Sequence, residues 1–212
     1  MVRELESAVE LTYFIDCGAH CGESILYAKK LFGTDITVIS FEGIPYLADK
    51  LTELYADDDS VMIQNSLVWI ESGTNKLYLS TEWSDGSSMY AEKTSGGVSE
   101  DLYVEVPTFD LSTWITTTFS KDDYIILKLD VEGAEYDILE KMIKDGTLDH
   151  IDILCGEFHD MKIDNDTVKE KAKFVYKYLS DNNIDFKIWE TPTMNYIDGK
   201  LVERPTNMED IV

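Results

Sequence analysis

Carboxylates gather directly after the apolar run Tyr124–Leu129, which has the near-continuous hydrophobicity of a strand buried on both faces. We expect Asp130 to stand at the carboxyl end of that strand, with Glu132 and Glu135 at the mouth of the next helix. A carboxylate placed there can accept a proton from a substrate or ligate a metal ion. A structural role, in which the two glutamates stabilise the helix dipole, would suit Glu135 but leaves Asp130 and Gly133 unexplained.

A second polar group follows the next apolar segment, Ile151–Leu154, where Glu157 and His159 are two residues apart. Neighbouring parallel strands end at the same edge of a sheet, so Asp130, Glu157 and His159 should converge, and they are the candidate catalytic residues. His159 or Asp130 could act as a base without a metal, or all three could ligate Mg²⁺ or Mn²⁺. A lone histidine is more often structural than catalytic. Of the two mechanisms, the metal-free one is preferred.

A glycine-bearing turn, Asp16-Cys-Gly-Ala-His-Cys-Gly22, follows the short apolar segment Tyr13–Ile15. Its glycines, Gly18 and Gly22, let the backbone approach a ligand, and the N-terminus of the next helix points into the same space. The spacing is not GxGxxG, and no phosphate-binding Lys-Ser or Lys-Thr pair follows. A nucleotide-like ligand without a pyrophosphate therefore fits better, although a purely structural turn fits equally well.

Glu42 directly follows the next β-branched segment, 37–41, and lies 26 residues after Asp16. An acidic residue at about this distance from a glycine turn commonly accepts hydrogen bonds from ribose hydroxyls. By itself Glu42 could simply be a charge that favours a helix dipole. Together with the glycine turn it favours an adenosyl ligand.

These residues also carry a resemblance to a known family. The matching segments, in chain order within about residues 12–160, are Asp16-x-Gly-Ala-x-x-Gly22, Phe41-Glu42, Val106-Pro-Thr-Phe-Asp110, Lys128-Leu-Asp-Val-Glu-Gly-Ala-Glu135 and Glu157-x-His159. They are similar to the FkbM-type family of S-adenosylmethionine-dependent methyltransferases, and the Asp-Val-Glu-Gly-Ala-Glu string is the most specific. The sequence departs from the family where the proline after Phe-Glu is displaced to Pro45, and where Cys17, His20 and Cys21 occupy the glycine turn.

The resemblance implies a Rossmann-like, seven-stranded class I methyltransferase sheet, mostly parallel with one antiparallel strand and with helices on both faces. It implies S-adenosylmethionine as cofactor and methyl transfer to a hydroxyl of a sugar, a glycan or a related small molecule. The alternative is a non-catalytic adenosyl-binding or interaction module, and the missing GxGxxG disfavours an NAD-dependent oxidoreductase. The residues expected to bind the cofactor are Asp16, Gly18, Ala19, His20, Gly22, Glu42, Asn65, Ser66, Ser87, Ser88 and Asp130.

Strand and helix patterns alternate along the chain, which predicts one doubly wound α/β domain over residues 1–212. The closing segments, Phe186–Trp189 and 195–202 with a turn at Asp198-Gly199, look like a pair of antiparallel strands. The predicted strands are 13–15, 37–41, 61–63, 124–129 and 151–154, and the predicted helices centre on 25–32, 47–55, 138–143 and 168–179.

One stretch, about 76–106, breaks this alternation. Residues 76–80 and 102–106 alternate like an inserted hairpin, and the polar segment 81–101 lies between them. Loops of this length are usually functional or disordered, so a lid or pocket wall and a mobile surface loop are equally good interpretations. As a lid, it would cover the cofactor or a sugar face with Trp83, Met89 and Tyr90, and Ser87 and Ser88 would bond the cofactor's methionine end.

The composition limits the partners. Acidic residues outnumber basic ones by 42 to 18, giving a net charge of −24, which disfavours nucleic acid and anionic membranes. With 44% apolar residues the chain can still bury a core. We see no secretory leader, no bilayer-length apolar run, and no disulfide or zinc pattern in Cys17, Cys21 and Cys155. A cytoplasmic protein with a small acceptor is therefore expected.

Overall fold

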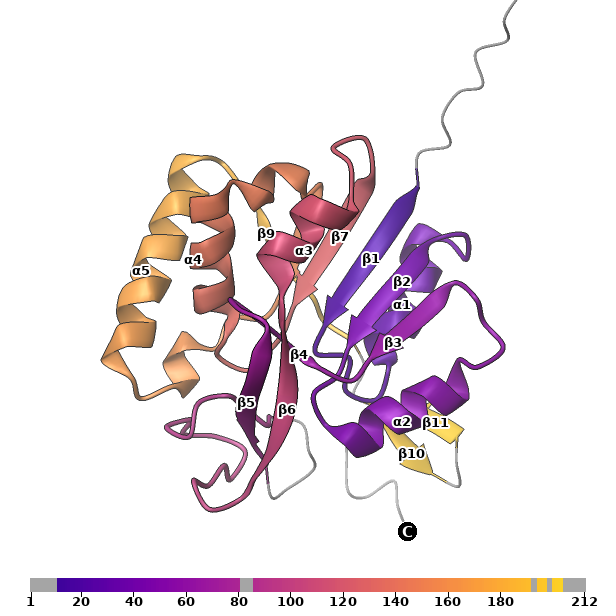
Figure 1. Cartoon of the computed structure of the whole chain (residues 1–212), viewed down its shortest axis with the longest axis horizontal. Coiled ribbons are helices and arrows are strands. Elements are labelled where there is room, and N and C mark those ends of the chain that lie inside the picture. The colour runs from indigo at the N-terminus through magenta and orange to yellow at the C-terminus, as the bar shows by residue number, and fades with distance from the viewer. Residues whose placement is uncertain (1–10, 81–85, 192–193, 198–199, 204–212) are drawn as a thin grey trace, which may run out of the picture.

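The central sheet has the strand order of a doubly wound α/β fold. The computed structural model describes residues 11–80 and 86–191 and the backbone of 194–197 and 200–203. Within them, six strands run parallel in the order β3-β2-β1-β7-β8-β9 (Figure 1). Their bounds are β1 (Thr12–Cys17), β2 (Thr37–Phe41), β3 (Val61–Gln64), β7 (Tyr124–Leu129), β8 (Ile153–Gly156) and β9 (Phe186–Ile188). The order reverses between β1 and β7, and ligands bind at the carboxyl ends of strands at such a switch point.

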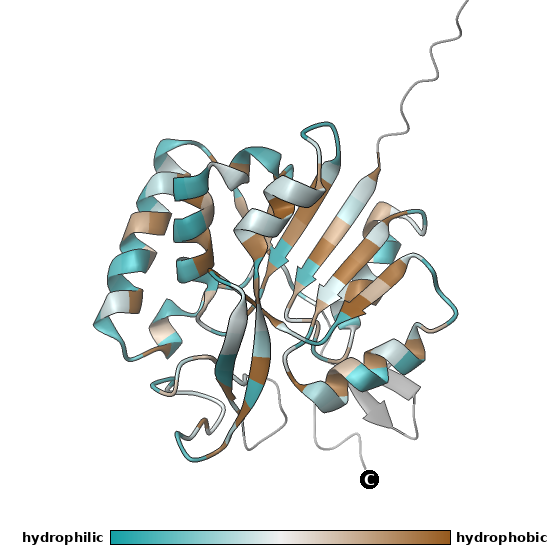
Figure 2. Cartoon of the chain, viewed as in Figure 1, coloured by the Kyte–Doolittle hydropathy of each residue, from teal (hydrophilic) through white to brown (hydrophobic). Residues whose placement is uncertain are grey.

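Helices cover both faces of this sheet (Figure 1). Adjacent strand residues alternate between two cores: Phe14 packs with α1 and α2, whereas Ile15 packs with α3, α4 and α5. Both residues are fully buried, and the apolar strands stand out between helices with polar outer faces in Figure 2. The helices are α1 (Glu23–Phe32), α2 (Pro45–Leu54), α3 (Leu111–Thr118), α4 (Glu135–Asp145) and α5 (Asp166–Asp181), with short 3₁₀ turns at η1 (Thr147–His150) and η2 (Asp160–Lys162).

A second sheet of three strands lies beside the switch point. It consists of β4 (Leu67–Trp69), β5 (Gly73–Tyr78) and β6 (Tyr103–Asp110). β5 and β6 run antiparallel, with Lys76 opposite Glu105 and Tyr78 opposite Tyr103, and β4 joins the other edge of β6 in parallel. The predicted pairing of 76–80 with 102–106 is therefore part of a three-stranded sheet that the sequence did not reveal.

The end of the chain differs from the prediction. β9 pairs in parallel with β8, and the antiparallel pair consists of β10 (Met194–Ile197) and β11 (Lys200–Glu203), which form a separate sheet. Trp189 explains the departure, because its ring packs against Phe14 and Tyr27 and its indole N–H donates to Ser24. Because Trp189 packs on α1, the chain does not turn back there to form an antiparallel partner of β9.

Two further expectations about the strands are not confirmed by the described residues. The predicted turn at Asp198-Gly199 lies outside the described residues. The seventh, antiparallel strand is not part of the central sheet in the portion of the chain that the structure describes. No helix in that portion is long and apolar enough to cross a bilayer.

Candidate active site

An open pocket lies at the carboxyl ends of β1, β2 and β7, where the strand order reverses. It encloses about 890 Å³ when the open space at its mouth is included. The lining residues are Gly18, His20, Glu23, Ser24, Phe41, Glu42, Gly43, Ile44, Ser66, Leu67, Val68, Leu77, Gly86, Ser87, Met89, Lys128, Asp130, Val131, Glu132 and Thr191.

The glycine turn is fixed by its neighbours. Gly18 has φ +90°, and a Cβ there would lie 2.0 Å from the carbonyl oxygen of Asp130. The amides of Gly18 and Ala19 both donate to the carbonyl of Phe41 at 3.0 Å. Only glycine therefore lets β1 turn this close to β7. Gly22, also at positive φ, faces Leu51 of α2 and not the pocket.

A buried lysine ties the turn to the end of β7. The Lys128 ammonium donates to the carbonyl of Gly18 at 2.8 Å and lies 3.1 Å from Asp16 and 3.5 Å from Asp130. Burial disfavours its charge, but attraction by Asp16 and Asp130 raises the pKa of Lys128 above its ordinary value. Asp16 is fully buried, accepts a hydrogen bond from Ser40 and does not line the pocket. Its role is to hold Lys128.

Glu42 lines the pocket at the end of β2, on the other side of β1 from Lys128. One carboxylate oxygen accepts the amide N–H of His20 and the other that of Ile44, each at 2.7 Å. The side chain is only 6% exposed, and burial raises the pKa of Glu42 to about 7 despite these two donors. Asn65 stands behind it and donates to the Glu42 carbonyl at 2.9 Å. The carboxylate thus changes charge near neutral pH while facing the pocket.

The expected cofactor-binding residues divide into two groups. Those that line the pocket are Gly18, His20, Glu42, Ser66, Ser87 and Asp130. Those that lie behind its wall are Asp16, Ala19, Gly22, Asn65 and Ser88. Ser88 is fully buried and donates its hydroxyl to the carbonyl of Glu132 at 2.6 Å, so it supports the backbone of a pocket residue.

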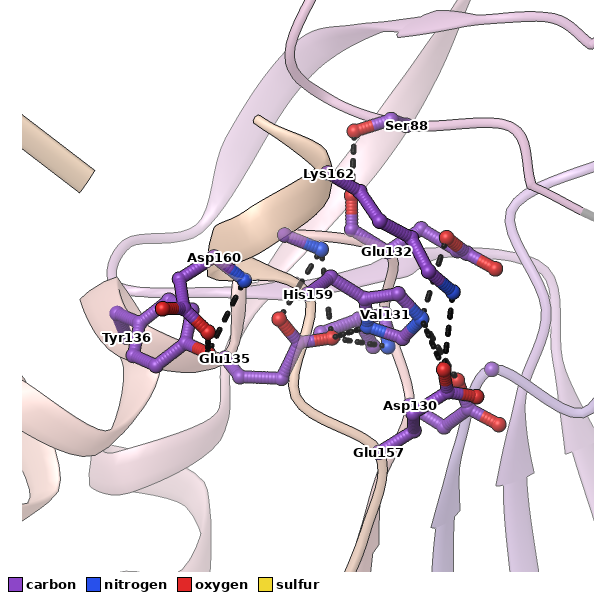
Figure 3. A network of polar contacts seen from close by, with 12 residues as sticks. Ser88, Asp130, Val131, Glu132, Glu135, Tyr136, Glu157, His159, Asp160 and Lys162 are labelled. Atoms are coloured by element: carbon purple, nitrogen blue, oxygen red, sulfur yellow. Dashed lines mark hydrogen bonds and ion pairs between the residues drawn. The ribbon is translucent and has the colours of Figure 1, made fainter. Parts of the chain in front are cut away.

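A histidine surrounded by carboxylates lies beside Asp130 (Figure 3). His159 is fully buried, and its Nδ1 lies 2.9 Å from Oε1 of the equally buried Glu135. Its Nε2 faces oxygens of Glu132 at 3.3 Å, Glu157 at 3.5 Å and Asp130 at 3.9 Å. Burial by itself lowers the pKa of His159, but the bond to Glu135 and the neighbouring carboxylates raise it to about 9.

The structure brings the three expected catalytic residues together and adds a fourth. Glu157 is half exposed, pairs with Lys162 at 2.9 Å and does not line the pocket. Glu132 does line it and belongs with Asp130 and His159 to a compact cluster of potential ligand atoms. Glu132 adopts φ +57°, a left-handed conformation that is uncommon outside glycine. With this backbone conformation, the Glu132 side chain faces the pocket.

Glu135 is fully buried, does not line the pocket and has the structural role considered for it. It is the first residue of α4, and its carboxylate accepts the amides of Val131 at 2.9 Å and Gly133 at 3.0 Å. It therefore stabilises the turn before the helix and also fixes the ring of His159. A long-range contact of this kind leaves no trace in local spacing.

The segment after β5 forms one wall of the pocket through Gly86, Ser87 and Met89. It is tied to the rest of the molecule by a bridge between Tyr78 and Ser88 and an ion pair between Lys93 and Glu132. The hydroxyl of Tyr90, expected to cover a ligand, donates instead to Asp137 on α4. Trp83 lies outside the described residues.

The residues that sequence reasoning missed are Glu23, Lys128 and the apolar wall from β2, β4 and β5, whereas Glu132 was expected at the strand end but not counted among the catalytic residues. Lys128 carries a visible signal, since it is the one charged residue within the apolar run 124–129. A buried lysine requires a partner, and Asp16 in the neighbouring strand is that partner.

Comparison with protein families shows the family of the chain. The model of the methyltransferase FkbM domain matches residues 16–187, which include both walls described above. The chain belongs to the FkbM methyltransferase family. Searches of curated proteins and of solved structures gave no significant match. Membership of a methyltransferase family implies a methyl donor, which is in general S-adenosylmethionine.

Proposed function

We propose that this protein transfers the methyl group of S-adenosylmethionine to a hydroxyl oxygen of a small acceptor, such as a sugar, a glycan or a related compound. The observation that carries the proposal is the position of Asp130. Its carboxylate is 30% exposed and lines the switch-point pocket at the end of β7, on the other side of β1 from the strand that ends before Glu42. A hydroxyl is a poor nucleophile until a base takes its proton, and Asp130 is placed to do so.

The pocket offers a distinct surface to each part of the cofactor. Glu42 would accept the ribose hydroxyls, because each oxygen that binds an amide keeps a second lone pair. Ile44 and Leu67 provide an apolar wall for the adenine. The methionine end would lie along the turn at Gly18, close to Ser87. Acidic groups around the pocket favour the cationic sulfonium.

In the reaction, the acceptor oxygen attacks the methyl carbon while the bond from that carbon to sulfur breaks. The hydroxyl proton passes to the carboxylate of Asp130 and then to solvent, leaving a methyl ether and S-adenosylhomocysteine. A sulfonium methyl is already activated, so the protein mainly aligns the reactants and excludes water. His159 is fully buried and serves as a positioning residue for Asp130 and Glu132.

The test has two stages. Calorimetry should first show one molecule of S-adenosylmethionine bound per chain. Formation of S-adenosylhomocysteine is then measured with a panel of sugars, glycans and hydroxylated natural products, and with matched deoxy compounds. Turnover that requires the hydroxyl supports the proposal.

Three results would contradict it. Absence of cofactor binding removes the proposed donor. Binding without turnover on the whole panel indicates instead a non-catalytic adenosyl-binding module, and turnover that persists on the matched deoxy compounds excludes a hydroxyl acceptor.

A further inference from the structure

We infer that Asp130, Glu132 and His159 form a binding site for a divalent transition-metal cation at the edge of the cofactor pocket. One potential ligand atom from each residue lies within 4.8 Å of the other two. The existence of the site is argued from geometry alone. Its use in catalysis rests on the proposed function.

His159 is the residue that points to a ligand. Its ring is fully buried, and Nε2 makes no hydrogen bond with any of the described residues. The nearest carboxylate oxygens, on Glu132 and Glu157, are 3.3 and 3.5 Å away. Charge-assisted hydrogen bonds between nitrogen and oxygen are shorter, at about 2.7–2.9 Å. The buried ring nitrogen thus faces carboxylate oxygens without a hydrogen bond to them, and a cation bound by both the nitrogen and the oxygens would satisfy it.

The other ring nitrogen supports the same conclusion. Nδ1 of His159 is held by Glu135 at 2.9 Å, and the Glu135 carboxylate is fixed by the amides of Val131 and Gly133. Metal-bound histidines commonly donate their second N–H to a carboxylate in this way, which fixes the tautomer and the ring orientation. Nε2 is thereby directed into the cluster, and a cation there would take the place of a proton.

The two carboxylates are presented by rigid backbone. Asp130 follows a strand that is buried from Ile125 to Leu129, and its amide donates to the Cys17 carbonyl at 3.1 Å. Glu132 is held in its left-handed turn by the 2.6 Å bond from Ser88. Two atoms bonded to one cation at about 2.2 Å can be at most about 4.4 Å apart. His159 Nε2 satisfies this limit with both carboxylates, at 3.3 and 3.9 Å.

Nearby lysines would moderate the affinity. Lys93 lies 2.7 Å from Oε2 of Glu132, and Lys128 lies 3.5 Å from Oδ2 of Asp130. The distance from His159 to Asp130 involves the other oxygen, Oδ1, which is therefore directed towards the cluster. Glu132 must share its charge between Lys93 and the cation, so binding should be reversible and not structural.

The donor set selects the metal. Mg²⁺ and Ca²⁺ prefer sites made of oxygen, whereas an imidazole with two carboxylates suits Mn²⁺, Fe²⁺ or Zn²⁺. Asp130 and Glu132 both line the pocket, so open coordination positions would face an acceptor. A hydroxyl bound there would lose its proton more readily, and Asp130, which would hold the cation through Oδ1, would accept that proton on its other oxygen, Oδ2. The inference thus deepens the proposed function.

Metal binding can be measured without any methyl transfer. The full chain, treated with EDTA and desalted, is titrated with Mn²⁺ while the electron paramagnetic resonance signal of free Mn²⁺ is followed. Zn²⁺ and Mg²⁺ are compared by calorimetry. We expect one Mn²⁺ per chain and weaker binding of Mg²⁺. Glu132→Gln and His159→Gln should each lower Mn²⁺ affinity by about 10-fold or more, whereas Glu140→Gln, which changes a partly exposed partner of Lys144 outside the cluster, should not.

Glu132→Gln is the decisive variant, since a partly exposed side chain can change without unfolding the core. Circular dichroism and thermal melting verify that it is folded. No binding of Mn²⁺ or Zn²⁺ at about 1 mM overturns the inference, as does binding that Glu132→Gln leaves intact. S-adenosylmethionine binding without Mn²⁺ binding would refute only the metal site. Mn²⁺ binding without methyl transfer would refute only the proposed function.

Discussion

Glu135 and His159 form a fully buried pair, joined at 2.9 Å between Oε1 and Nδ1, although 24 residues separate them in the sequence. The pair connects the first turn of α4 to the loop that follows β8. It therefore fixes the ring of His159 and the direction in which its Nε2 faces the neighbouring carboxylates.

Breaking this pair should destabilise the protein. Glu135→Gln keeps the size of the side chain but removes the charge that faces His159 and two backbone amides. We expect the free energy of unfolding to fall by about 3 kcal/mol, the usual cost of removing one partner of a buried pair. Urea denaturation measures it. Glu140→Gln on the same helix should stay within about 0.5 kcal/mol of the wild type, and an equally small effect of Glu135→Gln would refute the assigned role.

The pKa of Glu42 predicts how cofactor affinity depends on pH. Ribose hydroxyls donate to the carboxylate, so the charged form binds, and below pH 7 the protein must first release a proton. The affinity for S-adenosylmethionine should therefore rise by about tenfold from pH 6 to pH 8. Calorimetry on Glu42→Gln should show weaker binding, by ~1–3 kcal/mol at pH 8, and a reduced pH dependence. The same pH profile in both proteins would remove Glu42 from the ribose site.

Gly18 and Gly33 offer a matched pair of substitutions. Both have positive φ, but a Cβ on Gly18 meets the Asp130 carbonyl at 2.0 Å, whereas a Cβ on Gly33 meets nothing within 4 Å. Gly33→Ala should cost about 1 kcal/mol of stability. Gly18→Ala must displace β7 or the turn, so it should cost more and also abolish cofactor binding. Thermal melting and calorimetry distinguish them, and equal effects would show that the turn tolerates a side chain.

The wall formed by residues 86–89 should respond to the cofactor. Gly86, Ser87 and Met89 line the pocket, so S-adenosylhomocysteine should slow amide hydrogen exchange across this segment. Peptides from α5, which contributes no lining residue, serve as the control. Unchanged exchange in 86–89 on saturation would mean that the segment does not contact the ligand.

The sequence was most informative where burial alone dictates structure. The apolar run 124–129 predicted a central strand, and the polar residues just after it, with Glu42 and the glycine turn, predicted the side of the sheet that holds the pocket. Strand ends meet at one edge by geometry, so no long-range information was needed. The family was accessible for the same reason, since its motifs occupy those ends.

The remainder depends on contacts that local patterns do not encode. The left-handed turn at Glu132 is stabilised by Ser88, 44 residues earlier, and decides that Glu132 faces the pocket. The direction of the chain after β9 is set by Trp189 packing on Phe14. Similarly, β4 is a short apolar segment whose sequence does not indicate that it pairs with β6, about 40 residues later in the chain.

The central claim is that Asp130 takes the acceptor proton in the pocket that binds S-adenosylmethionine. Turnover and cofactor affinity should therefore be measured on Asp130→Asn, with Asp149→Asn, a change of an exposed residue, as the control. We predict that Asp130→Asn binds the cofactor nearly as well as the wild type while kcat falls by ~10²-fold or more, the range for loss of a general base. Wild-type turnover by Asp130→Asn would contradict the account.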